Sequence, residues 1–323
     1  MFKKLNFRIL VIIFVLLLAI VLISKYIDSR KGERTFKKEL ITVNPNDVTA
    51  IIYNPDPKSR DEVKIVKEGN VWKVYSNNKG YRADSSLVAG MINSLISLQP
   101  ERVAATDKSK WKEFQVEDTS GTHIKVMKGD EVLASLIIGK FSYTPQPSQN
   151  PYQKPQGKMT SYVRVADDDE VYAVDGFLKF SFQKNVNALR DKGLMRTKKE
   201  NIMRVVFNYP GDSSFTLMRQ GDRWTVDGVV CDSAKTVRYL ATIAMLTCGD
   251  FVDESVLNLN RPRFTVSVDA NNMNPVELKA FPADSVNKYI VTSSINQDGY
   301  FSGAKTKLFD KIFVSRKSFF QGK

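Results

Sequence analysis

The sequence predicts an α+β protein: an N-terminal transmembrane helix, then two tandem copies of a domain in which a helix packs on an antiparallel sheet. Three observations support this fold class. The chain opens with a long apolar run, a pattern around tryptophan occurs twice, and a stretch with helical periodicity follows each occurrence. The 323 residues, 42% of them hydrophobic, suffice for two domains with separate cores.

The N-terminal segment is predicted to cross a membrane once. Every residue from Ile9 to Ile23 is apolar, and a helix from Leu5 to Ile23 would be about 28 Å long, close to the hydrocarbon thickness of a bilayer. No small-residue cleavage site follows this run. We therefore expect residues 1–30 to remain as an anchor and residues 31–46 to form a juxtamembrane linker.

Basic residues flank this segment on both sides. The first 38 residues carry nine basic and two acidic residues, a large share of the net charge of +13. A strict charge count would keep the domains in the cytoplasm, but long domains translocate largely regardless of charge. We expect a single-pass protein of the cell inner membrane with periplasmic domains. The rest of the chain is nearly balanced in charge, which argues against a nucleic-acid partner.

An internal duplication defines the two domains. The segment EGNVWKV, from Glu68 to Val74, recurs as QGDRWTV, from Gln220 to Val226. Further matches keep the same order, so the first domain is predicted over residues 47–195 and the second over residues 196–323. The residues expected to define the fold are the hairpin glycines, the tryptophans and the aspartates that begin the helices: Gly69, Trp72, Asp84, Gly221, Trp224 and Asp232.

Both domains are expected to follow one order of elements. In the first, strands over 48–53, 63–67 and 71–75 precede a helix with the apolar stripe Leu87, Val88, Met91, Leu95 and Leu98. Strands over 124–127, 132–138, 161–165 and 171–174 follow, and an aromatic-rich segment over 177–182 closes the domain. The second domain repeats this order, with its helical stripe over 237–246 and its closing segment over 308–313.

A proline-rich insertion interrupts the first domain over residues 141–160. Proline at this density blocks helices and ladder hydrogen bonds, so the insertion is predicted to be a long exposed loop. Two interpretations stay open: a solvated loop, and a loop that docks on a partner. The candidates for partner binding are Pro145, Pro147 and Tyr152.

One acidic run is the sharpest cluster of carboxylates in the sequence. It consists of Asp167, Asp168, Asp169 and Glu170, between two predicted strands. The run lacks the spacing of an EF-hand, so a charged hairpin turn is the first interpretation and a weak divalent-cation site is the alternative. No other metal site and no cofactor are predicted.

The remaining reactive residues do not assemble into a known catalytic motif. The sequence contains no GxSxG, P-loop or GxGxxG string, and His123, the only histidine, has no nucleophile near it in sequence. Cys231 and Cys248 flank a predicted helix whose length would hold them too far apart for a disulfide. We expect free thiols and no enzyme activity, with a carboxylate-based glycan hydrolase as the alternative.

Several of these segments resemble an uncharacterised bacterial family, domain of unknown function 4340. The resemblance is carried by the G-x-x-W-x-V hairpin, the Tyr81-Arg82-Ala83-Asp84 lead into the helix, and the strands Leu136-Ile137-Ile138-Gly139 and Tyr162-Val163. It covers most of residues 48–190 and is weaker over 202–315, where Cys231-Asp232 replaces the Ala-Asp pair. It implies a membrane-anchored envelope protein that serves gliding-motility-type systems or transporters powered by ATP-binding cassettes, and it assigns no catalytic residue.

Two functions therefore stay open. The first is a non-catalytic envelope accessory or scaffold protein whose partner is a membrane protein such as a transporter. The second is a cell-wall glycan-binding module or glycan hydrolase. An aromatic platform beside paired carboxylates in one cleft would favour the second.

Overall fold

The computed structural model describes residues 17–18, 39–59, 61–76, 78–145, 157–252 and 259–320. The chain forms two compact units. One is drawn from Met1–Asn44, Ser94–His123 and Ser135–Lys179, and the other from Pro45–Asn93, Ile124–Ala134 and Phe180–Lys323.

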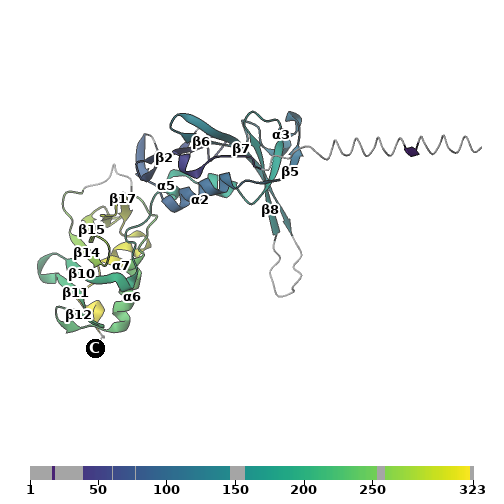
Figure 1. Cartoon of the computed structure of the whole chain (residues 1–323). Helices are drawn as coiled ribbons and strands as arrows, with labels where there is room; N and C mark the ends of the chain where they lie inside the picture. Colours follow the sequence, from purple (N-terminus) through teal and green to yellow (C-terminus); the bar gives the residue numbers. More distant parts are fainter. Residues whose placement is uncertain are drawn as a thin grey trace, which may run out of the picture. The chain divides into compact units, whose positions relative to one another are not determined.

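Two large antiparallel sheets dominate the fold (Figure 1). The first has nine strands in the order β4-β3-β2-β1-β6-β7-β8-β9-β5. Their bounds are β1 Ala50–Tyr53, β2 Val63–Glu68, β3 Val71–Ser76, β4 Lys79–Arg82, β5 Pro100–Ala105, β6 Thr122–Lys128, β7 Glu131–Pro145, β8 Gly157–Val165 and β9 Val171–Asp175.

The second sheet has eight strands in the order β13-β12-β11-β10-β14-β15-β16-β17. Their bounds are β10 Ile202–Asn208, β11 Phe215–Gln220, β12 Arg223–Val226, β13 Val229–Val230, β14 Phe264–Ala270, β15 Val276–Pro282, β16 Tyr289–Ser293 and β17 Asn296–Ser302. Apart from β5, each strand of the first sheet has a counterpart at the same place in the second. Two copies of one domain would give this shared order; the boundaries of the domains stay a prediction.

The helices are few and mostly short. The α-helices are α2 Ser85–Ile96, α3 Trp111–Phe114, α4 Lys179–Phe182, α5 Val186–Leu189, α6 Ser233–Ala244 and α7 Leu308–Ile312. The 3-10 helices are η1 Pro45–Asp47, η2 Lys108–Lys110, η3 Lys199–Asn201, η4 Gly211–Ser213, η6 Lys305–Lys307 and η7 Arg316–Phe319. Only α2 and α6, with 12 residues each, are longer than five residues among the described helices.

The second sheet has a core that includes its longest helix. Tyr239, Leu240 and Ile243 of α6 are buried against apolar residues of β10, β11, β14 and β15. This burial follows from the apolar stripe of α6, whose members recur every three or four residues and so face one side. The C-terminal segment closes the same core, because Leu308, Ile312 and Phe319 are at most 1% exposed.

The predicted α+β class is wrong, because the described chain is mostly β. Helical periodicity occurs once in each predicted domain and yields one 12-residue helix, α2 or α6. The ladders are more extensive than predicted: β4, β5 and β13 were not expected, and β7 and β8 extend well beyond their predicted ends. In these segments the backbone satisfies its hydrogen bonds through neighbouring strands, which local sequence patterns do not reveal.

The predicted transmembrane helix is part of the same correction. In the part of the chain that the structure describes, no helix has the length and apolar character needed to cross a membrane. The predicted anchor, residues 1–30, lies outside the described residues apart from Leu17 and Leu18.

Candidate functional site

Strands β7 and β8 continue past the neighbouring strand as a two-stranded arm, which we define as residues 141–145 and 157–161. Strand β9 pairs with β8 only as far as Thr160, opposite Asp175, whereas the pairing of β7 with β8 continues to Pro145 opposite Gly157. In Figure 1 the end of this pair, labelled β8, leaves the other strands of its unit. Beyond β9, strand β8 of the arm is therefore paired only with β7 among the described residues, and Lys158 of the arm forms an ion pair with Glu101 of β5 at 2.5 Å.

A β-bulge at the base of the arm sets which side chains lie on each face. Ile138 pairs with Val163 but Phe141 pairs with Ser161, so β7 holds one extra residue between them. Gly139 lies in this bulge, and a Cβ there would lie 2.1 Å from the carbonyl oxygen of Phe114. Because side chains alternate along a strand, the extra residue turns the following side chains of β7 to the opposite face.

The arm has one apolar and one polar face. Residues directly opposite each other in a ladder share a face, so one face holds the pairs Phe141–Ser161, Tyr143–Met159 and Pro145–Gly157. The other face holds Ser142–Thr160 and Thr144–Lys158. The side chains of the apolar face are exposed by 46% at Phe141, 50% at Tyr143 and 40% at Met159. Exposed apolar faces of this kind are typical of surfaces that bind partners.

The base of the arm is held in place by its own unit. The ring of Phe141 lies 4.4 Å from that of Phe177, centroid to centroid. The Ser161 hydroxyl donates to the carbonyl of Gly176 at 2.7 Å and accepts from the Leu178 amide at 3.1 Å. These contacts fix the orientation of the apolar face where the arm begins.

The predicted partner-binding residues fall on and beyond this arm. Pro145 is exposed and is the last residue of β7; Pro147 and Tyr152 lie outside the described residues. The prediction of a loop from residue 141 onward is wrong at both ends of the insertion, where β7 and β8 pair. Proline fits at Pro145 because it ends the ladder at an edge, where a missing N–H is tolerated. The alternation of Phe141, Tyr143 and Pro145 was the signal that the sequence analysis missed.

The acidic run forms the turn between β8 and β9. Asp167 has a left-handed backbone with a φ of 65°, and the Tyr172 hydroxyl lies 2.8 Å from Glu170 Oε2 and 3.0 Å from Asp168 Oδ2. Burial and these two carboxylates raise the pKa of Tyr172. Asp169 points elsewhere and pairs with Lys108 at 3.4 Å. Within the described ranges, no three His, Cys, Asp or Glu side chains come together in a way that could hold a metal ion.

The fold-defining residues occupy equivalent turns and helix starts. Gly69 and Gly221 have φ values of 58° and 59°, a conformation that favours glycine, at the β2–β3 and β11–β12 turns. The Asp84 carboxylate accepts the Leu87 amide at 3.2 Å at the start of α2, and that of Asp232 accepts the Lys235 amide at 2.9 Å at the start of α6. Each aspartate thus satisfies an N–H group that the helix leaves unpaired.

The two tryptophans are half-buried rather than central to a core. Trp224 packs against the core of the second sheet, and its carbonyl accepts the Cys231 amide at 2.9 Å. The carbonyl of Trp72 accepts the Ala83 amide at 2.8 Å in the same way. Each tryptophan thus connects its hairpin, β2–β3 or β11–β12, to the segment that leads into α2 or α6.

The Tyr81-Arg82 pair of the family motif makes structural contacts. Tyr81 lies under the guanidinium of Arg190, whose central carbon is 3.9 Å from the ring centroid. Arg82 pairs with Asp191 at 3.3 Å, and Asp191, only 4% exposed, also binds the guanidinium of Arg196. A carboxylate buried to this extent needs such charged partners.

A hollow of about 530 Å³ lies beside the β3–β4 hairpin. Its lining combines carboxylates, tyrosines and amides: Asp61, Glu62, Tyr75, Tyr81, Asn185 and Asn187. The Asp61 carboxylate accepts the Ser59 hydroxyl at 2.7 Å, and the Tyr75 hydroxyl donates to Glu68. Two adjacent carboxylates and two aromatic rings in one hollow are the combination that would suit a glycan.

The remaining reactive residues lie apart from both surfaces. His123 Nε2 is 2.9 Å from the carbonyl oxygen of Asp118. Cys231 and Cys248 are free thiols, as expected, with Cys231 half-buried and Cys248 buried. Burial raises the pKa of both thiols.

Comparison with known proteins identifies a family. The family model described as "Domain of unknown function (DUF4340)" matches residues 72–262. No curated protein and no solved structure matches the chain.

Proposed function

We propose a function from one premise: the chain belongs to the DUF4340 family. The protein is a non-catalytic accessory or scaffold protein of the cell envelope, and it docks on a membrane-protein partner through the apolar face of the β7–β8 arm. The observation that carries this proposal is the separation of the arm into an exposed apolar face and a polar face.

The arm suits docking because its apolar face is already ordered. Burial of apolar surface yields about 25 cal/mol per Å², and Tyr143 and Met159 each keep a large part of their surface for a partner. The ladder and the contacts of Phe141 at the base fix the backbone before binding, so little conformational entropy remains to be lost. Pro147 and Tyr152, which lie outside the described residues, stay sequence-based candidates for the same contact.

The proposed location is the inner membrane, with both sheets on the periplasmic side. The apolar run from Ile9 to Ile23 and its basic flanks support membrane association. The family resemblance makes a transporter powered by an ATP-binding cassette the first partner to test.

Co-purification tests this proposal. The full-length protein is extracted from its host's membranes in mild detergent as wild type, as Tyr143→Ala/Met159→Ala and as Thr144→Ala, which changes only the polar face. We expect the wild type and Thr144→Ala to retain a stoichiometric membrane protein and the double variant to lose it. Equal recovery of that protein by all three would contradict the docking role.

A glycan-binding function is the second candidate, supported by the hollow beside the β3–β4 hairpin. Tyrosine rings can stack on sugar faces, and the amides of Asn185 and Asn187 can bind hydroxyl groups. The carboxylates of Asp61 and Glu62 could act in binding or in hydrolysis.

Wall-derived glycan fragments test this second candidate. Binding without turnover, weakened by Asp61→Asn or Glu62→Gln and unaffected by Asp130→Asn at an exposed turn outside the hollow, would support a binding module. Turnover lost in one of the two hollow variants would identify a hydrolase and contradict the non-catalytic proposal. The absence of both binding and turnover would exclude this second candidate.

A further inference from the structure

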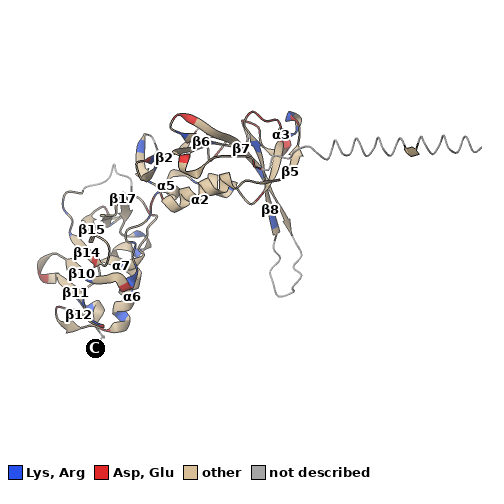
Figure 2. Ribbon diagram, viewed as in Figure 1, with Lys and Arg blue, Asp and Glu red and all other residues tan. Residues whose placement is uncertain are grey.

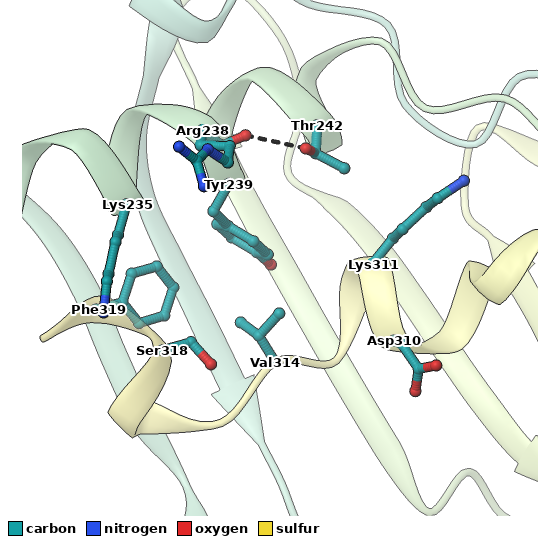
Figure 3. Close-up of a pocket in the computed structure, with 9 residues that line it drawn as sticks. All are labelled: Lys235, Arg238, Tyr239, Thr242, Asp310, Lys311, Val314, Ser318 and Phe319. Atoms are coloured by element: carbon teal, nitrogen blue, oxygen red, sulfur yellow. Dashed lines mark hydrogen bonds between the residues drawn. The ribbon is translucent and has the colours of Figure 1, made fainter. Parts of the chain in front are cut away.

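A second hollow lies between α6 and the C-terminal segment formed by α7 and η7 (Figure 3). It has a volume of about 370 Å³. Lys235 and Arg238 of α6 and Lys311 of α7 are among the residues that line it, and Asp310 is the one acidic residue of this lining. Three cations against one carboxylate leave a net charge of +2 around the hollow.

The floor of the hollow is apolar. Tyr239 is 8% exposed, Phe319 is 1% exposed, and Val314 lies beside them (Figure 3). The Tyr239 hydroxyl donates to the carbonyl of Ile312 at 2.9 Å, so the floor presents the ring of Tyr239 and not its hydroxyl hydrogen. The hollow thus combines a cationic rim with an apolar base.

The cationic side chains of the rim keep hydrogen-bond donors available for a ligand. Lys235 Nζ donates to the carbonyl of Phe320 at 2.6 Å, which holds this ammonium in place and leaves it two further hydrogens. Among the described residues, Arg238 and Lys311 form no ion pair. In Figure 3 the carboxylate of Asp310 points away from α6, the helix that carries Lys235 and Arg238, and the Lys311 side chain also extends away from these two residues.

The corresponding helix of the first sheet shows that the fold does not require these cations. Lys235 and Arg238 are the third and sixth residues after the capping Asp232, and the same positions after Asp84 are Leu87 and Gly90. Helix α2 carries no charged residue, and in Figure 2 it is tan along its length, whereas blue bands occur near α6. The same 12-residue helix therefore forms without a basic rim, so the rim is available for another role.

We propose that this hollow binds a phosphate monoester. A phosphate monoester carries a charge of about −1.5 to −2 at pH 7 and three acceptor oxygens. That charge matches the hollow's excess of positive charge, and the guanidinium of Arg238 and the ammonium of Lys235 can donate to the phosphate oxygens. A carboxylate, with one charge and two oxygens, would leave part of this rim unpaired.

Two sources share this chemistry: the headgroup of an anionic phospholipid such as phosphatidic acid, and a soluble metabolite such as glycerol 3-phosphate. The apolar floor favours a ligand whose phosphate is attached to an apolar group, because Val314 and Phe319 could contact that group.

Calorimetry of the full-length protein in neutral detergent tests the site. Glycerol 3-phosphate is titrated into the wild type, Arg238→Gln/Lys311→Gln and Lys305→Gln, an exposed lysine of the same C-terminal segment that does not line the hollow. A parallel experiment compares micelles that contain phosphatidic acid with micelles that contain phosphatidylcholine. We expect one site per chain, at least tenfold weaker binding in the double variant and unchanged binding in Lys305→Gln.

The outcomes separate the two sources and the possible failures. Binding of glycerol 3-phosphate alone indicates a soluble ligand, and a preference for phosphatidic acid micelles indicates a lipid; both support the site. Equal weakening by Lys305→Gln would show general charge attraction and overturn the proposal. Absence of any binding tighter than about 1 mM, with no preference between the micelles, would also overturn it. None of these outcomes depends on the arm.

Discussion

The ring of Tyr143 lies across the backbone of Gly157, its diagonal neighbour on the opposite strand of the arm. A Cβ at residue 157 would lie 2.0 Å from two carbons of this ring, so a side chain there would have to displace the ring. Tyr143 pairs directly with Met159, and Pro145 pairs with Gly157. One aromatic ring thus covers a glycine at the end of the arm, an arrangement that stabilises exposed strands.

Gly157→Ala should displace the ring of Tyr143 and reorganise the apolar face. We expect recovery of the membrane partner to fall about tenfold while the remainder of the fold stays intact. Gly90→Ala is the matched control, because a Cβ there meets no atom within 4 Å on an exposed helix position. That control should raise the free energy of unfolding by about 0.5–1 kcal/mol and leave recovery unchanged. Normal recovery with Gly157→Ala would argue against this face as the contact.

Asp232→Ala should destabilise α6. The carboxylate of Asp232 accepts the Lys235 amide, and loss of such a cap costs about 1 kcal/mol. Hydrogen exchange of the first-turn amides of α6 should accelerate roughly fivefold, while Asp232→Asn, which keeps a capping oxygen, should remain close to wild type. Equal exchange in the alanine and asparagine variants would mean that the cap contributes nothing.

Trp224→Ala should cost less than the loss of a buried tryptophan. The ring is half-buried against the core of the second sheet, so we expect about 2 kcal/mol instead of the roughly 3–5 kcal/mol typical of full burial. The loss in free energy of unfolding is measured by chemical denaturation, with hydrogen exchange of the β11 and β12 amides as the probe. An unchanged free energy of unfolding in Trp224→Ala would contradict the packing of this ring against the core.

The two thiols should differ in reactivity. Burial raises the pKa of both thiols, but Cys248 is only 4% exposed whereas Cys231 is half-buried. At pH 8 iodoacetamide should therefore modify the more accessible Cys231 first in the folded protein, and both thiols at equal rates in urea. Because the folded-state pKa is raised, the stability that the protonated Cys248 thiol confers is complete below the unfolded thiol's pKa. It falls as the pH rises through the folded-state value. Rapid modification of Cys248 in the folded protein at pH 8 would show that the site is open.

Local signals in the sequence predicted the turns and helix starts correctly. Gly69 and Gly221 adopt the left-handed backbone expected at a hairpin, and Asp84 and Asp232 cap the helices that periodicity placed after them. These features depend on neighbouring residues along the chain, so the sequence contains the information directly.

The extent of the sheets and the arrangement of the surfaces depend on contacts between distant residues. Strand β5 pairs with β9, about 70 positions later in the chain, and no pattern within Pro100–Ala105 reveals that partner. A side chain at position 139 of the bulge would clash with the carbonyl of Phe114, 25 residues earlier in the chain. The basic hollow joins α6 to a segment about 70 residues further on, so its three cations form no pattern in the sequence.

Site-specific photo-crosslinking tests the docking proposal most directly. A benzoylphenylalanine is placed at residue 143 on the apolar face of the arm or at residue 144 on the polar face, in the full-length protein in its native membrane. Docking through the apolar face predicts a crosslink from residue 143 to one membrane protein and none from residue 144. Equal crosslinking from both positions, or none from residue 143 while the partner still co-purifies, would contradict it.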